Sequence, residues 1–177
     1  MGAAPSLRRL SVRECLATAY HPDREYVDGR LIKRHVGTLP HSRLLKVLLG
    51  CFHSFEHDLG FETLPSCRTR TRTSRFRVPD VMLIRAPFDK RARFYEGVPL
   101  AIIEILSPED RLRYVIERFE EYQALGVPHI VQMDPDRRVT YIFESDNLIR
   151  KELTTLTENL PFDTAALYAQ LDESPRS

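Results

Sequence analysis

Two acidic residues stand within or beside apolar stretches, where a carboxylate is energetically costly. Glu104 lies in VPLAIIEIL over residues 98–106, and Asp80 precedes the apolar residues of RVPDVMLI. An unpaired buried carboxylate tends to shift its pKa and become neutral, and a bound cation removes that tendency. Two acids on neighbouring strands could hold one Mg²⁺, which prefers oxygen ligands. Such a metal can activate water and stabilise charge on a phosphodiester.

Both acids also have ordinary structural explanations, and their spacing alone leaves these open. Asp80 follows Pro79 and could simply cap or turn a strand, while Glu104 could pair with a buried arginine. Structural ion-pair networks shift the pKa of an acid as functional sites do. An acid in such an environment is therefore only a candidate for a functional residue.

A cation for this region is expected from a helix over residues 110–125, which Gly126 ends. Arg118 lies at the edge of the inward stripe and is placed to reach the sheet, although it could instead extend along the helix flank. Glu117, Glu120 and Glu121 are expected further round, towards solvent. The predicted inward stripe consists of Leu112, Val115, Ile116, Phe119 and Gln123.

A row of arginines precedes Asp80 in CRTRTRTSRFRVPD. In the part that alternates with threonine, the arginines share one face of a strand. Such a row suits the phosphate backbone of DNA, which provides most sequence-independent affinity. A charged face that protects an edge strand from aggregation explains it equally well. The candidate DNA-binding residues are Arg68, Arg70, Arg72, Arg75 and Arg77.

The remaining elements follow from hydrophobic periodicity and turn residues. Asp28-Gly29 is a strong two-residue hairpin turn, and Gly60 ends an amphipathic helix. Together the elements predict a mixed α/β sheet flanked by helices. They are a helix over 11–20, the hairpin over 24–34, a helix over 39–60, extended chain over 61–84 with a turn near 73–74, strands over 98–106, 129–134 and 139–145, and a short helix within 160–173.

Composition limits the remaining choices. The chain has 177 residues and a formal net charge of +1, so we expect one domain, and DNA must be attracted by a local patch. Three cysteines form no even disulfide framework. There is no signal peptide and no apolar run of ~18 residues, which favours a cytoplasmic protein with no membrane span.

An ordered set of motifs resembles the Uma-type restriction endonucleases, a bacterial family of the PD-(D/E)XK nuclease superfamily. The motifs are REYVDGRLI, LPHSRLLKVL, RVPDVMLI, IIEILSPED and RFEEYQALGVPHIVQMDP, within a core of about residues 11–170. The resemblance implies a restriction-endonuclease-like α/β fold, with an N-terminal helix and hairpin before the sheet. It also implies a DNA substrate, and a homodimer is possible because cutting both strands usually needs two active sites.

The resemblance also implies a set of site residues. Asp80 and Glu104 become ligands of Mg²⁺, for which Mn²⁺ is a possible substitute, and the carbonyl of Ile105 becomes a backbone ligand. Glu25 falls on the hairpin glutamate of the family, near the metal or its supporting residues. His41 falls on the histidine that starts the second helix. Apart from the resemblance, Tyr122 lies beside Arg118 on the helical wheel and is a further candidate for supporting the site.

One departure from the superfamily pattern concerns the lysine that assists the attacking water. The usual position, two residues after Glu104 on the same face, is occupied by Leu106. In the resembled family the lysine has moved to the following helix, where this chain has Arg118. Arginine keeps the charge but cannot act as a general base. The leading expectation is a Mg²⁺-dependent DNA endonuclease. The alternatives are a degenerate nuclease-fold protein that binds DNA or a protein without cutting, and a purely structural ion-pair core.

Overall fold

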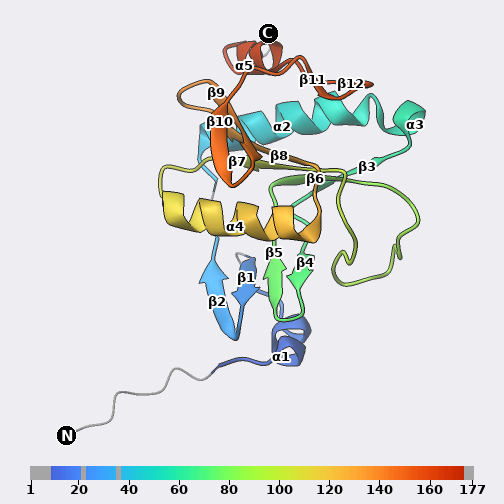
Figure 1. Ribbon diagram of the computed structural model, residues 1–177, viewed down its shortest axis with the longest axis vertical. Coiled ribbons are helices and arrows are strands. Elements are labelled where there is room, and N and C mark those ends of the chain that lie inside the picture. The colour runs from blue at the N-terminus through green and yellow to red at the C-terminus, as the bar shows by residue number, and fades with distance from the viewer. Residues whose placement is uncertain (1–8, 21–22, 35–36, 174–177) are drawn as a thin grey trace, which may run out of the picture.

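A six-stranded mixed sheet forms the centre of the molecule in the computed structural model, which describes residues 9–20, 23–34 and 37–173 (Figure 1). Its order is β10-β9-β8-β7-β6-β3, with β7 and β8 parallel and the other neighbours antiparallel. The parallel pair is connected through α4, as a crossover requires. The strands are β3 (Glu62–Pro65), β6 (Val81–Ile84), β7 (Ala101–Ile105), β8 (His129–Asp134), β9 (Val139–Glu144) and β10 (Asn147–Arg150).

A second, four-stranded sheet, in the order β2-β1-β5-β4, lies beneath α4 in Figure 1. Asp28 and Gly29 both have positive φ, 48° and 90°, which the tight turn between β1 and β2 requires. The preceding helix α1 (Val12–Ala17) has a capping box formed by Ser11 and Glu14. The strands are β1 (Arg24–Val27), β2 (Arg30–Lys33), β4 (Thr69–Arg72) and β5 (Arg75–Arg77).

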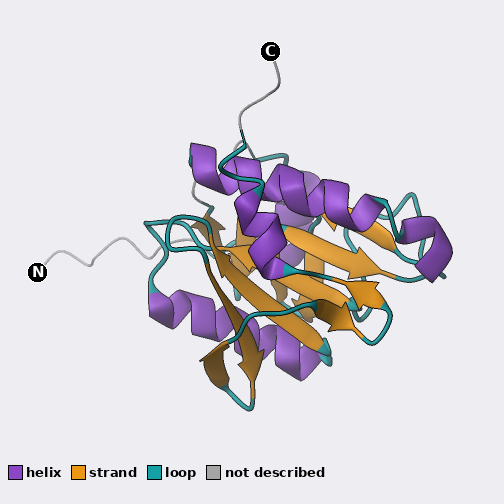
Figure 2. Ribbon diagram, turned by 90° about the horizontal axis from the view of Figure 1, so that it is seen from above, coloured by secondary structure: helices purple, strands orange, loops and turns teal. Residues whose placement is uncertain are grey.

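Helices cover both faces of the large sheet (Figure 2). On one face, α2 (Leu39–His53) and α5 (Thr164–Ala169) pack their apolar residues against alternate side chains of β7, including Ile103 and Ile105. On the other face, α4 (Leu112–Leu125) packs against Ile102. Glu104 follows Ile102 by two positions, so its side chain lies on the α4 face.

The expected mixed sheet, its flanking helices, the N-terminal helix and the hairpin are confirmed. The predicted single helix over 39–60 is wrong, since α2 ends at His53 and a short α3 (Glu56–Leu59) follows. The Ser54 hydroxyl donates to the Cys51 carbonyl and Phe55 N–H donates to the Phe52 carbonyl, which tightens and ends the last turn. A small sheet that was not expected consists of β11 (Thr155–Thr157) and β12 (Leu160–Pro161).

Helix α4 is rotated relative to the predicted inward stripe. Leu112 and Gln123 are exposed, and Glu121, which was expected towards solvent, is only 1% exposed. Arg75 and Arg77 from β5 supply the cations that make this burial possible. The buried residues of α4 are Val115, Phe119, Glu121 and Tyr122.

No helix in the described part of the chain is long and apolar enough to cross a membrane.

Candidate active site

A cavity of about 100 Å³ lies where the two sheets meet the start of α4. The hairpin β1–β2, the end of β7, the segment after β7 and the first turns of α4 all contribute to its wall. In Figure 1 this is the side on which α4 begins above the end of β2. Asp80, Glu104, Glu25 and Arg118 all line the cavity. The sequence-predicted acids and the candidate cation are therefore brought together.

Sheet register sets the two central acids side by side. Val81 pairs with Ile103 in the antiparallel β6–β7 ladder. Continuing the ladder by one residue places Asp80 opposite Glu104. Directly opposite residues on antiparallel strands point to the same face. The apolar residues that follow Asp80 and precede Glu104 thus anchor both acids at one end of the buried sheet.

Asp80 is held by contacts on both carboxylate oxygens. One oxygen accepts a 2.8 Å hydrogen bond from the Ile105 N–H and lies 3.4 Å from Nε2 of His41. The other accepts a 2.5 Å hydrogen bond from Arg34. Burial alone would raise the pKa of Asp80, but the contacts with His41 and Arg34 outweigh it and lower the pKa to about 2. Asp80 is therefore ionised at neutral pH.

Glu104 has weaker compensation for its charge. Its Oε1 accepts a 2.8 Å hydrogen bond from the Tyr122 hydroxyl, and its Oε2 lies 4.0 Å from a terminal nitrogen of Arg118. Burial raises the pKa of Glu104 to about 7, because the Arg118 charge offsets burial only in part and Asp80 adds repulsion. A second cation at this cavity would therefore favour the ionised form of Glu104.

Arg118 lies deep in the cavity wall with donor capacity to spare. Its side chain is only 13% exposed, and its nearest acids are Glu104 at 4.0 Å and Asp110 at 3.6 Å. Its Nε is buried and has no hydrogen-bond partner within the described ranges. A buried guanidinium N–H without an acceptor is unfavourable. Arg118 therefore lines the cavity with one N–H that no acceptor among the described residues satisfies.

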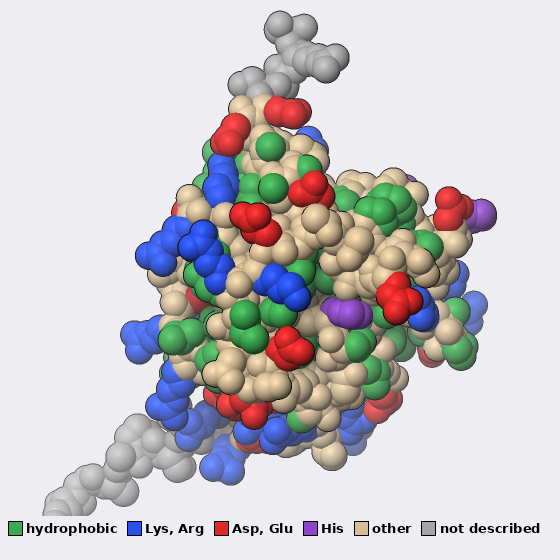
Figure 3. Space-filling model, turned by 45° about the horizontal axis from the view of Figure 1, so that its top comes forward, with side chains coloured by type: hydrophobic (Ala, Val, Ile, Leu, Met, Phe, Trp, Pro, Cys, Tyr) green, Lys and Arg blue, Asp and Glu red, His purple; other side chains and the backbone are tan. Residues whose placement is uncertain are grey.

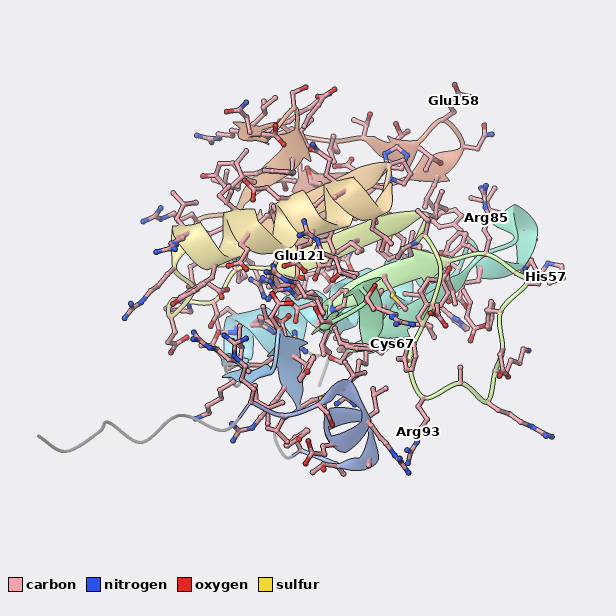
Figure 4. All side chains as sticks on the ribbon, turned by 60° about the horizontal axis from the view of Figure 1, so that its bottom comes forward. His57, Cys67, Arg85, Arg93, Glu121 and Glu158 are labelled. Atoms are coloured by element: carbon pink, nitrogen blue, oxygen red, sulfur yellow. The ribbon has the colours of Figure 1, made fainter. Side chains whose placement is uncertain are left out.

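The second half of the arginine row is turned inward. Arg77 is buried, donates to Glu25 at 2.7 Å, and donates through two nitrogens to Glu121 at 2.6 and 2.9 Å. Arg75 bridges Asp28 and Glu121. Figure 4 shows Glu121 on the side of α4 that faces the small sheet. Direct contact of Arg77 with a DNA phosphate would require these ion pairs to open.

Two of the three arginines in the first half of the row pair with acids that do not line the cavity. Arg68 pairs with Asp23 at 2.6 Å, and Arg70 pairs with Glu96 at 2.5 Å while its guanidinium lies 5.8 Å from the Phe76 ring centre. Arg72 is exposed. DNA contact by these three arginines stays a prediction.

Sequence reasoning missed Arg34, although the hairpin contained a signal for it. The turn fixes the register so that Ile32 lies opposite Glu25. Alternation then places Arg34 on the same face as Glu25, and all three residues line the cavity. Lys33, Asp110 and Tyr114 were also missed; they line the same cavity. Asp110 and Tyr114 depend on how the segment after β7 folds, which local patterns do not reveal.

The donor set fits a hard divalent cation with a small number of protein ligands. Asp80, Glu104 and Ile105 line one cavity, and carboxylate and carbonyl oxygens are the kind of ligand that Mg²⁺ takes together with water. Among the residues that the structure describes, no group of three or more His, Cys, Asp and Glu side chains is arranged to hold a metal. Water and substrate oxygens would therefore complete the coordination of a metal here.

Comparisons with known proteins identify the family and the fold of the chain. The model of a family described as "Uma2: Putative restriction endonuclease" matches residues 15–170. The crystal structure of a "putative nuclease belonging to DUF820" from Anabaena variabilis has a TM-score of 0.78 and 19% sequence identity, covering 92% of this chain and 99% of that one. This likeness shows a shared fold. A search of curated proteins finds no match. Because the family match spans most of its length, the chain belongs to the Uma2 family of nuclease-like proteins.

Proposed function

We propose that the protein is a Mg²⁺-dependent endonuclease that hydrolyses DNA phosphodiester bonds. The observation that carries this proposal is the pair Asp80 and Glu104 on adjacent strands, facing one cavity with Arg118 in its wall. Membership of the Uma2 family supports the reaction class. A homodimer is proposed for cutting both strands.

Each residue of the site has a separate task in this proposal. Asp80, Glu104 and the Ile105 carbonyl hold Mg²⁺, or Mn²⁺ in its place, which supplies an activated water and charge stabilisation when bound. Arg118 donates to a phosphate oxygen as negative charge develops, because Arg118 lines the cavity and keeps its charge. Arg118 does not remove a proton from water.

The neighbouring residues keep these groups in place. His41 and the Ile105 N–H orient the carboxylate of Asp80, and Tyr122 orients that of Glu104. Glu25 lines the cavity, but one of its oxygens is bonded to Arg77. We therefore propose that Glu25 supports the site through Arg77 rather than activating water.

The test of this function is cleavage by the purified protein. With Mg²⁺ or Mn²⁺ it should cut plasmid and oligonucleotide DNA, and EDTA or the substitution Asp80→Ala should stop the reaction. The proposal fails if the unaltered protein shows no cleavage above the Asp80→Ala variant across varied DNA substrates.

A second candidate function is DNA or protein binding without cleavage, and the residue that favours it is Arg118. Under the leading proposal, Arg118→Lys should keep cleavage because the cation remains. Arg118→Gln should lower the rate by roughly 10²- to 10³-fold, as loss of a transition-state donor does. Gel-based rates measure both effects. If only the lysine variant cuts DNA, the natural chain is a degenerate nuclease.

Arg34 gives a separate prediction about metal affinity. Its guanidinium bonds an oxygen of Asp80, so a metal at that oxygen must compete with it. We expect Arg34→Gln to bind Mg²⁺ several-fold more tightly in a calorimetric titration. Arg24→Gln, on the same hairpin, should leave the affinity unchanged because Arg24 does not line the cavity. A weaker affinity in Arg34→Gln would show that Arg34 helps to form the site.

A further inference from the structure

We infer that the mouth of the cavity binds an unpaired, single-stranded stretch of nucleic acid, with one base stacked on Tyr114. The inference rests on the proposed function because it concerns the substrate of the same cavity. It adds a strand preference and a binding residue. Four features of the described residues support it: the depth of the two acids, the exposed ring of Tyr114, the cations at the opening, and the contacts of the acids near it.

The acids lie too deep for a phosphate to reach them at the molecular surface. Asp80 is 5% exposed and Glu104 is 2% exposed, and the cavity in front of them measures about 100 Å³. A phosphate must therefore pass between the end of β2 and the start of α4. A single strand can turn its backbone into a narrow opening, whereas a duplex must be bent or deformed to bring a phosphate that deep.

Tyr114 presents an aromatic ring at this opening. It stands in the first turn of α4, lines the cavity and is 53% exposed. Aromatic rings at the mouth of a basic groove stack with bases of any identity, which is a common way to bind single strands. Stacking on Tyr114 would hold a nucleotide beside the opening while its phosphate enters.

Cations surround the opening on two sides and at its base. Lys33 on β2 and Arg111 before α4 are exposed and line the cavity from opposite walls, and Arg118 lies inside. Figure 3 shows basic side chains gathered along the left edge of the molecule, the side on which α4 begins and β2 ends in Figure 1. Cations at the rim and inside the cavity attract a phosphate backbone to this opening.

The acids at the opening are already engaged. Glu109 accepts a 2.6 Å hydrogen bond from the Ser107 hydroxyl. Asp110 accepts from the Ser107 N–H at 2.9 Å and lies 3.6 Å from Arg118. The first turn of α4 itself contains no acidic residue. The first turn of α4 therefore adds no carboxylate of its own to those of Glu109 and Asp110, which stand just before it.

The test is fluorescence anisotropy with EDTA present, so that binding is measured without hydrolysis. A labelled single-stranded oligonucleotide should bind more tightly than the duplex of the same sequence. Tyr114→Ala should weaken single-strand binding roughly tenfold or more, as loss of one stacked base does. Tyr114→Phe, which keeps the ring, should bind normally. Leu112→Ala is the matched control, because Leu112 is 66% exposed on the same turn and does not line the cavity.

Other outcomes separate this inference from the proposed function. Equal binding of duplex and single strand, with no effect of Tyr114→Ala, overturns the inference. Sedimentation that changes from dimer to monomer in Tyr114→Ala also overturns it, because Tyr114 would then contact a second copy of the chain. If duplex is cut in an Asp80-dependent way with Tyr114 irrelevant, only the inference fails. If single strands bind through Tyr114 and are never cut, only the proposed function fails.

Discussion

Replacing Glu104 with glutamine should abolish metal-dependent DNA cleavage and leave the protein folded. The amide keeps an oxygen that can accept the hydrogen bond from Tyr122, so the buried contact survives. It removes the negative charge that a divalent cation requires. We expect the rate to fall by at least roughly 10²-fold, the scale on which removing electrostatic stabilisation acts. Gel-based cleavage rates and circular dichroism, measured on the same preparation, check both parts.

The matched control is Glu158→Gln, which changes an exposed glutamate that does not line the cavity and lies apart from Glu121 in Figure 4. This variant should cut DNA at the rate of the unaltered protein. If Glu104→Gln cuts as fast as the control, Glu104 is a structural partner of Arg118 and Tyr122. The account of the active site would then be wrong.

The second large effect concerns the stability of the junction between the small sheet and α4. Glu121 is 1% exposed and accepts hydrogen bonds from Arg77, Arg75 and Thr71. Removing one partner of a buried ion pair leaves the other charge without compensation, which costs about 3–5 kcal/mol. Glu121→Gln should therefore lower the free energy of unfolding by that amount in urea denaturation at neutral pH.

The pH dependence of this loss has a definite sign. Burial acts to raise the pKa of Glu121, but hydrogen bonds and charge from Arg77 and Arg75 outweigh it and lower the pKa below the ordinary 4.5. The stability that ionised Glu121 contributes is then present above that ordinary value and is lost as the pH falls through the folded-state pKa. The difference between the unaltered protein and Glu121→Gln should therefore shrink in acid.

Glu117→Gln is the control for this measurement. Glu117 approaches the same arginines at 3.1 and 3.5 Å, but its side chain is 37% exposed. Exposed ion pairs contribute about 0–1 kcal/mol, so this variant should be nearly as stable as the unaltered protein. Equal losses in the two variants would contradict the account of a buried ion-pair cluster.

The two central acids could be placed from sequence because their signals are local. Asp80 and Glu104 each interrupt or adjoin an apolar run, and alternation determines which face each one occupies. Arg34 was also within reach, since the turn at Asp28-Gly29 fixes the hairpin register. In each case the spacing of a few residues along one strand or hairpin determines which face the side chain occupies.

The burial of Glu121 and the pairing of Arg77 could not be predicted in the same way. A helical wheel is oriented by placing its most apolar side towards the core. On that basis Glu121 was predicted to face solvent. The structure buries it because the small sheet provides Arg75 and Arg77 beside α4. This contact joins β5 to a helix more than forty residues later in the chain, and packing between elements decides it rather than local pattern. Arg75 and Arg77 turn inward for the same reason, because Glu121 of α4 pairs with both of them.

Anomalous diffraction from Mn²⁺-soaked crystals tests the central claim most directly, because it locates the metal without depending on turnover. We expect one peak between Asp80 and Glu104, about 2–2.5 Å from a carboxylate oxygen of each, distances typical of oxygen ligands to divalent cations. We also expect Arg34 to move away from the Asp80 oxygen that it now bonds. Full Mn²⁺ exposure with no peak between the two acids, and Arg34 still bonded to Asp80, would contradict the central claim.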